Sequence, residues 1–181
     1  MNGRALTTPA ARLRTHHVIQ GAHHVAATPD DVLTTVLGSC ISICLHDRAA
    51  GVGGMNHFLL PGDPIRNRGE ARYGINAMEL LINAVLKAGG HSRRLEAKVF
   101  GGANATGSRL GIGALNAEFA FWFLQNEGIP CAARDVGGVH ARKLRYWPHS
   151  GQVQVMLLAH PPVPPSPAPR TISEGETDLF I

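Results

Sequence analysis

The fold is decided by the stretch Asp31-Val-Leu-Thr-Thr-Val-Leu-Gly-Ser-Cys-Ile-Ser-Ile-Cys-Leu-His-Asp47. Residues 31–37 and 41–46 are rich in β-branched and apolar side chains, which predicts two strands. Gly38 and Ser39 lie between them and indicate a tight break rather than a long loop. Cys40 is therefore expected where one strand ends and the next begins.

The rest of the chain alternates further strands with two helices. Apolar residues at helical spacing predict one helix over residues 73–88, and a second is expected over residues 115–127. Two helices supply too few crossovers for a doubly wound sheet. We therefore expect an α+β fold, a single-domain sandwich of mostly antiparallel or mixed β-sheet with two main helices. The other expected strands cover residues 52–60, 95–100, 129–136, 141–147 and 152–159.

Length and composition limit the class of protein. The chain has 181 residues, of which 44% are hydrophobic and 17% charged, with a formal net charge of +4. This suits one domain, and no apolar run is long enough to cross a bilayer. Three cysteines are too few for a disulfide framework and favour the cytoplasm. The charge is far below that of typical nucleic-acid binders. We expect neither nucleic-acid binding nor membrane insertion.

Both ends of the chain differ from its middle. Residues 1–24 contain basic residues without a hydrophobic pattern, and we expect a flexible basic arm there. Residues 161–181 are rich in proline and then acidic, which predicts a tail without a place in a sheet. The main domain is expected to cover residues 25–160.

Cys40 and His57 are the candidate catalytic pair. A cysteine on a tight turn can aim its own N–H and that of Ser39 at one point, as an oxyanion hole requires. His57 follows on a neighbouring strand, and an imidazole beside a thiol favours the nucleophilic thiolate. Thr34 or Thr35 is placed to orient the imidazole. On pattern alone, a buried apolar cysteine is the more frequent alternative.

Other conspicuous residues have simpler interpretations. Cys44 and Cys131 are expected as buried core cysteines. The glycine-rich stretch 101–113 matches no phosphate-binding signature, so no cofactor is expected. The histidines of the arm lack Cys or carboxylate partners, so no metal site is expected; they are His16, His17, His23 and His24. The aromatic residues expected to form a core stripe on the second helix are Phe119, Trp122 and Phe123.

Several ordered blocks resemble a known family. Residues 34–47 and 51–61 look like the CheD-type chemoreceptor glutamine deamidases, and residues 95–103, 112–116 and 135–142 resemble later blocks in the same order. The similarity covers about residues 30–158, nearly the whole core, and ordered blocks are more specific than a single motif.

The resemblance implies a catalytic Cys-His-Thr triad. Ungapped counting places it on Cys40, His57 and Thr34, and a one-residue shift would select Thr35 instead. The implied domain over residues 25–160 is a deamidase domain. Val136 departs from the threonine of the family pattern, and Val139-His140 from its Asn-Arg, so no substrate contact is assigned there.

The resemblance also implies a reaction and partners. The expected reaction hydrolyses glutamine side-chain amides on the cytoplasmic helices of methyl-accepting chemoreceptors to glutamate, through a cysteine thioester. A CheC-type phosphatase is a second expected partner. The alternative function is a non-catalytic interaction module that regulates such a phosphatase.

Overall fold

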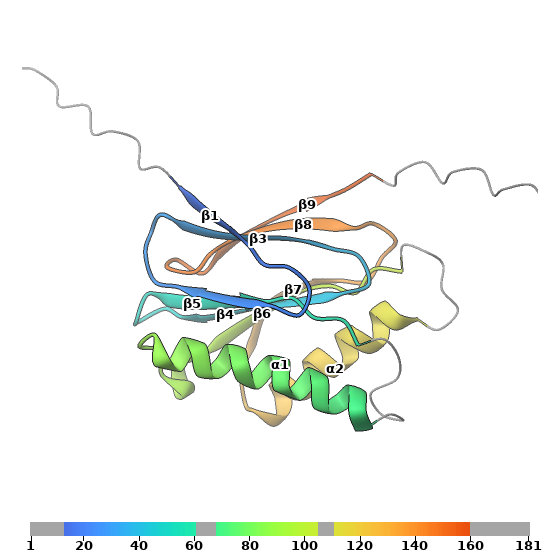
Figure 1. The fold of residues 1–181 in the computed structure, drawn as a ribbon, viewed down its shortest axis with the longest axis horizontal. Helices are drawn as coiled ribbons and strands as arrows, with labels where there is room; N and C mark the ends of the chain where they lie inside the picture. Colours follow the sequence, from blue (N-terminus) through green and yellow to red (C-terminus); the bar gives the residue numbers. More distant parts are fainter. Residues whose placement is uncertain (1–12, 61–67, 105–110, 160–181) are drawn as a thin grey trace, which may run out of the picture.

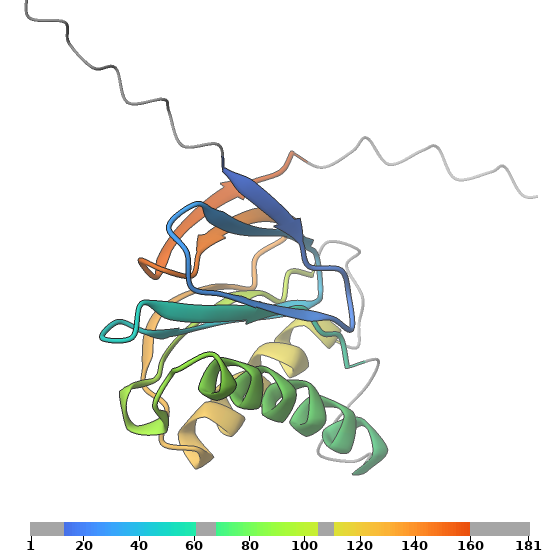
Figure 2. The ribbon, with the colours of Figure 1, turned by 60° about the vertical axis from the view of Figure 1, so that its left-hand side comes forward.

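Two mixed β-sheets pack face to face, and two helices cover the outer side of one sheet (Figures 1 and 2). The computed structural model describes residues 13–60, 68–104 and 111–159. The four-stranded sheet has the order β1 (Arg14–His17), β3 (Asp31–Leu37), β8 (Arg142–Trp147) and β9 (Gln152–Leu157). The five-stranded sheet has the order β2 (His23–Ala26), β5 (Val52–Asn56), β4 (Ile41–Asp47), β6 (Glu96–Gly101) and β7 (Cys131–Val136). The predicted α+β fold class is confirmed.

The chain changes sheets at the predicted break. Strand β3 lies in the four-stranded sheet and pairs with β8, whereas β4 lies in the five-stranded sheet between β5 and β6. Gly38 and Ser39 form the bend between the two strands. Cys40 therefore lies at the point where the chain crosses from one sheet to the other.

Alternation along the strands separates two apolar layers. Between the sheets lie the side chains Leu33, Leu37, Cys44, Met55, Phe100, Leu144 and Tyr146. The opposite face of β4 packs against the helices through Ile41, Ile43 and Leu45. Burial of a large apolar side chain contributes about 1.5–3 kcal/mol. Both sides of the five-stranded sheet are thus covered, which holds the Cys40 crossing in place.

Both helices begin earlier than predicted. Helix α1 covers Arg68–Lys87 and α2 covers Ile112–Asn126. The first residues of α1 are largely polar, so they add nothing to the apolar periodicity that marks a helix. A short 3₁₀ turn, η1 (Ser92–Arg94), follows α1.

Two expected core residues are exposed. On α2, Phe119 and Phe123 are buried, but Trp122 is 51% exposed, because it lies at the edge of the apolar stripe with its ring against Phe119. Cys131 is also exposed, and the prediction of a core cysteine is wrong there. It begins β7, an edge strand whose first residues are uncovered. Cys44 is buried, as predicted.

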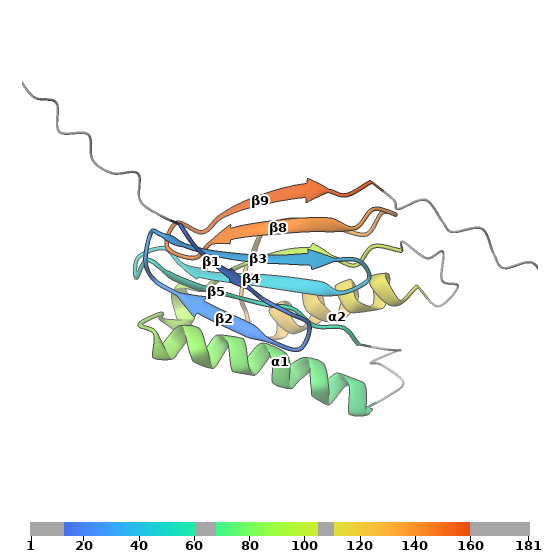
Figure 3. The same ribbon diagram turned by 45° about the horizontal axis from the view of Figure 1, so that its top comes forward.

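The N-terminal segment is part of the sheets from residue 14 onward. We expected a flexible arm through residue 24, but β1 pairs in parallel with β3, and β2 pairs antiparallel with β5 (Figure 3). The side chain of Asp31 contacts Arg14 and His16 and fixes β1 further. The sequence did not predict β1 because this short strand is largely exposed, so its side chains are polar and show no apolar alternation. The proposed arm residues 1–12 and tail residues 161–181 lie outside the described residues.

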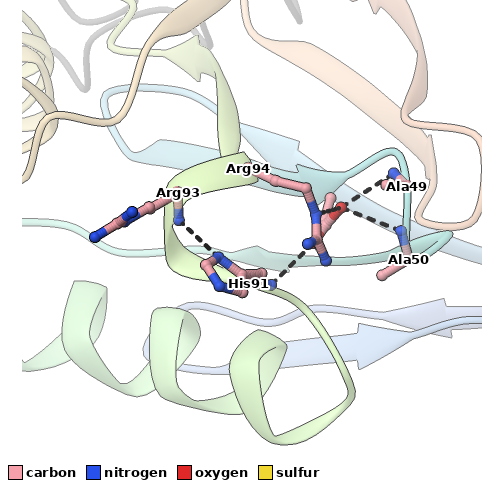
Figure 4. A network of polar contacts seen from close by, with 6 residues as sticks. Ala49, Ala50, His91, Arg93 and Arg94 are labelled. Atoms are coloured by element: carbon pink, nitrogen blue, oxygen red, sulfur yellow. Dashed lines mark hydrogen bonds and ion pairs between the residues drawn. The ribbon is translucent and has the colours of Figure 1, made fainter.

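A buried carboxylate fixes the other end of β4. Asp47 accepts hydrogen bonds from the N–H groups of Ala49, Ala50 and His91 and forms an ion pair with Arg94 (Figure 4). Asp47 has no exposed surface. These contacts hold the pKa of its carboxyl well below the usual range, chiefly through the Arg94 hydrogen bond. The network joins the β4–β5 turn to η1.

Candidate active site

Cys40 is half-buried at the start of β4. Its Sγ lies 3.5 Å from Oε1 of Gln20, and the thiol is the donor. A Cβ added to Gly38 would meet no atom within 4 Å, so space does not require glycine there. The requirement for glycine lies instead in the chain that faces Cys40, at the end of β6. There Gly101 has φ 115°, and a Cβ on it would overlap the carbonyl oxygen of Cys40. The close approach of Gly101 to the Cys40 backbone therefore requires glycine at position 101.

His57 lies just beyond the end of β5, on the same sheet face as Cys40. The N–H and C=O of Ile41 bond those of Phe58, which continues the β4–β5 ladder past the last strand residue. Ile41 and Phe58 both face the helices. Their neighbours Cys40 and His57 therefore both face the space between the sheets, in diagonal positions. The predicted neighbourhood of the two residues is present.

Thr35, and not Thr34, contacts the imidazole. Oγ1 of Thr35 lies 2.9 Å from Nδ1 of His57 and donates to the carbonyl oxygen of Val18 at 2.7 Å. Oγ1 of Thr34 donates instead to the carbonyl oxygen of Leu144 at 2.6 Å. Successive strand residues face opposite sides, so only one of the two threonines can face His57. Of the two threonines that the sequence left open for the triad, Thr35 therefore faces His57, and Thr34 faces the other side of β3.

The hydrogen bonds assign the tautomer of His57. The single hydroxyl proton of Thr35 is donated to Val18, so Nδ1 is the donor toward Thr35 Oγ1. The neutral ring then carries its lone pair on Nε2. This atom is buried and has no hydrogen-bond partner among the residues that the structure describes. The ring is thus oriented with its basic nitrogen unengaged.

Burial disfavours the charged form of both Cys40 and His57. Burial raises the pKa of the Cys40 thiol, although its own backbone N–H opposes this. Burial also lowers the pKa of His57, against the opposing effect of the Val18 carbonyl. Because Nε2 has no hydrogen-bond partner among the described residues, the Cys40 thiol and the imidazole do not form a hydrogen bond. The two side chains share one sheet face in diagonal positions and do not form a hydrogen-bonded ion pair.

The backbone around Cys40 is held through its carbonyl oxygens. The carbonyl oxygens of Gly38 and Cys40 accept from Ala103 N–H at 2.8 Å and Gly102 N–H at 2.7 Å. Among the described residues, neither the Ser39 nor the Cys40 N–H makes a backbone hydrogen bond. These are the two donors that the sequence predicted for an oxyanion hole.

Arg142 stabilises the backbone segment that bonds the Cys40 carbonyl oxygen. It is 2% exposed, and its guanidinium donates to the carbonyl oxygens of Gly101, Asp135 and Gly137. The Gly101 carbonyl and the Gly102 N–H point in opposite directions from one trans peptide plane. Arg142 therefore orients the N–H that holds Cys40. Sequence reasoning noted Arg142 only within a family block and did not identify this role.

Sequence reasoning also missed the N-terminal half of the site. Residues 18–22 connect β1 to β2 and pass over His57. Gly21 N–H donates to the His57 carbonyl oxygen at 2.7 Å, and His57 N–H donates to Ala22 at 3.0 Å. The signal that could have found this segment is its apolar Val18-Ile19 pair within a polar region.

The histidines of the N-terminal strands make structural contacts. Nε2 of His16 lies 2.9 Å from the Asp31 carboxylate, and its ring stacks on His24 with centroids 4.3 Å apart. Across residues 13–60, 68–104 and 111–159, no three His, Cys, Asp or Glu residues gather in a way that could hold a metal ion. Within the same ranges, no helix is long and apolar enough to span a membrane.

The fold and the site define a class: an α+β two-sheet protein with a thiol, an imidazole and a hydroxyl where the chain crosses between its sheets. The chain belongs to the CheD family, described as CheD chemotactic sensory transduction, whose family model matches residues 59–157. Three curated relatives carry the name "Probable chemoreceptor glutamine deamidase CheD".

The relatives match over most of their length. The protein of Caulobacter vibrioides is 50% identical over 175 residues, covering 91% of this chain and 92% of its own. That of Cereibacter sphaeroides is 48% identical over 166 residues, covering 92% and 83%. That of Agrobacterium fabrum is 53% identical over 139 residues, covering 76% and 77%.

Proposed function

We propose that this protein is a chemoreceptor glutamine deamidase with Cys40 as nucleophile, His57 as general base and Thr35 as the residue that orients His57. The proposed substrates are glutamines on the cytoplasmic helices of methyl-accepting chemoreceptors, which places the protein in the cytoplasm. The names of the relatives support the reaction and the substrate.

The contact between Thr35 and His57 carries the mechanistic part of the proposal. It holds the Nδ1–H tautomer and leaves the Nε2 lone pair unengaged on the sheet face that also carries Cys40. A base in this state can accept the thiol proton when a substrate arrives. Thr35 is neutral, so it orients the ring without adding the charge stabilisation that an aspartate supplies.

The chemistry follows in two steps. His57 Nε2 takes the thiol proton, and the Cys40 thiolate attacks the amide carbon of a substrate glutamine. The N–H groups of Ser39 and Cys40 stabilise the negative oxygen. The His57 imidazolium then gives its proton to the departing ammonia, which leaves a thioester. His57 next takes a proton from water, and the hydroxide attacks the thioester carbon. The C–S bond breaks, the imidazolium returns its proton to the departing Cys40 sulfur, and glutamate and the free thiol result.

The test is incubation of the full-length protein with a receptor cytoplasmic fragment, followed by mass spectrometry of each glutamine. We expect specific conversion of glutamine to glutamate by the wild type and none by Cys40→Ala. Cys44→Ala is the matched control, because Cys44 lies on the strand that follows Cys40, on the same face, but is fully buried. Conversion by Cys40→Ala equal to that of the wild type would contradict the proposal.

The alternative of a non-catalytic module that regulates a CheC-type phosphatase stays a prediction. A module that only binds a partner has no need for a buried imidazole with an unengaged nitrogen next to a cysteine. The contact of Thr35 with His57, on the sheet face that also carries Cys40, therefore supports the enzyme.

A further inference from the structure

The protein presents a glutamine of its own to Cys40. The Gln20 side chain lies in the segment 18–22, and its Oε1 is the acceptor of the Cys40 thiol at 3.5 Å. The functional group in contact with the candidate nucleophile is thus a primary carboxamide. This is the group that the proposed reaction hydrolyses.

The backbone holds Gln20 at this place from both sides. Before it, Val18 N–H donates to the Thr34 carbonyl oxygen at 2.9 Å. After it, Gly21 N–H donates to the His57 carbonyl oxygen at 2.7 Å. A group tethered this closely has a high effective concentration at its target. The backbone therefore keeps the Gln20 carboxamide within reach of Cys40, where an incoming ligand can compete with it.

We propose that the Gln20 side chain occupies the subsite that receives the carboxamide of a substrate glutamine, in a pose that blocks reaction. This inference rests on the proposed function. Incoming substrate must displace Gln20, so residue 20 sets how readily the nucleophile is reached.

The pose itself explains why Gln20 is not hydrolysed. Its oxygen accepts the S–H proton, so the thiol stays protonated and faces the oxygen of the amide. Attack requires a thiolate that faces the amide carbon, with the oxygen at the N–H groups of Ser39 and Cys40. A thiol is a weak donor and Gln20 is exposed, so the side chain can rotate away at small cost.

The first test is the rate at which iodoacetamide, itself a primary carboxamide, alkylates Cys40 in the full-length protein. Gln20→Ala empties the subsite, and we expect alkylation to be about threefold to tenfold faster, as loss of one weak hydrogen bond implies. Ile19→Ala is the matched control, because Ile19 is on the same segment and 71% exposed. It should react as the wild type does.

The second test adds propionamide as a free carboxamide. It should slow alkylation of Gln20→Ala by filling the vacated subsite, and leave the wild-type rate unchanged. Equal protection of both proteins, or a wild-type rate in Gln20→Ala, would overturn the proposal. Conversion of Gln20 to glutamate in the wild type but not in Cys40→Ala would overturn the blocked pose.

The third test separates this inference from the proposed function. In the receptor assay, Gln20→Ala should raise kcat/KM by about the same factor as it raises the alkylation rate. Absence of deamidation by every variant would contradict the proposed function. The alkylation rates would still decide whether Gln20 covers Cys40, because that measurement uses no receptor.

Discussion

The polar groups at the two ends of strand β4 differ in how fully they are hydrogen-bonded. At one end, the Asp47 carboxylate accepts three backbone N–H groups and pairs with Arg94. At the other, the thiol of Cys40 makes one weak contact, and Nε2 of the nearby His57 is buried without a partner. One end is saturated with hydrogen bonds, and the other is left incomplete.

The two environments lie at opposite ends of one strand, Asp47 being the last residue of β4 and Cys40 the residue just before its first. A buried polar atom without a partner costs about 1–3 kcal/mol, so it persists where a ligand or a reaction needs it. Asp47 has every partner it requires and serves the fold. In the proposed mechanism, the unengaged nitrogen of His57 receives the proton of Cys40.

The largest expected effect is complete loss of turnover in Cys40→Ala with little change in stability. The thiol is half-buried and its one hydrogen bond is weak, so its removal costs the fold little. Cys44→Ala should do the reverse, because it opens a cavity between the sheets but leaves the nucleophile. Deamidation rates and urea unfolding of both variants check this. Comparable losses of turnover would remove the distinction between the two cysteines.

Asp47→Ala should destabilise the protein by about 3 kcal/mol, because it leaves buried N–H groups and Arg94 without an acceptor. The pKa of Asp47 is lowered in the folded state, so its contribution is present above the ordinary aspartate range and lost as pH falls. The stability gap between wild type and variant should therefore shrink in acid. Urea unfolding at several pH values measures it, with exposed Glu118→Ala as the control. A gap independent of pH would contradict this account.

Thr35→Val should lower kcat by about tenfold to a hundredfold, since a misplaced catalytic group costs rate in that range. The variant keeps the shape of the side chain and loses the contact with His57 Nδ1. Thr34→Val should keep turnover and lose about 1 kcal/mol of stability through its bond to Leu144. Steady-state kinetics and unfolding of the pair distinguish them. Full activity in Thr35→Val would return the orienting role to Thr34.

The smallest expected effect is on the pH dependence of the free protein. Burial raises the pKa of Cys40, so alkylation should increase with pH and have its midpoint above the free cysteine value of about 8.5. Burial lowers the pKa of His57, so kcat/KM should persist to lower pH than an ordinary histidine allows and fall below it. Alkylation rates and a pH–rate profile test both. An alkylation midpoint below neutral pH would instead indicate a thiolate–imidazolium pair.

The sequence predicted the strands around Cys40 better than the choice between its two threonines. Strand β3 was predicted as Asp31–Leu37 and found there. Its residues are buried on both faces except Val36, so no polar alternation marks which threonine faces the neighbouring sheet. Only the packing of β3 on β5 decides between Thr34 and Thr35.

The sequence also could not predict that residues 18–22 and Arg142 contribute to the candidate site. Residues 18–22 acquire their role from contacts with His57, and Arg142 from contacts with Gly101. These pairs are distant in sequence, and neither has a local pattern. A family block can show that Arg142 is present, but only the fold shows which carbonyl oxygens it holds.

The pairing of β3 with β8 has a consequence for synthesis of the protein on the ribosome. Thr34 bonds Leu144, and Arg142 orients the loop that holds Cys40, so the surroundings of the thiol depend on residues translated about a hundred positions later. Such long-range closure is slow compared with local helix formation. A nascent chain therefore exposes Cys40 and His57 well before they are assembled, and the candidate site is complete only after β8 has emerged.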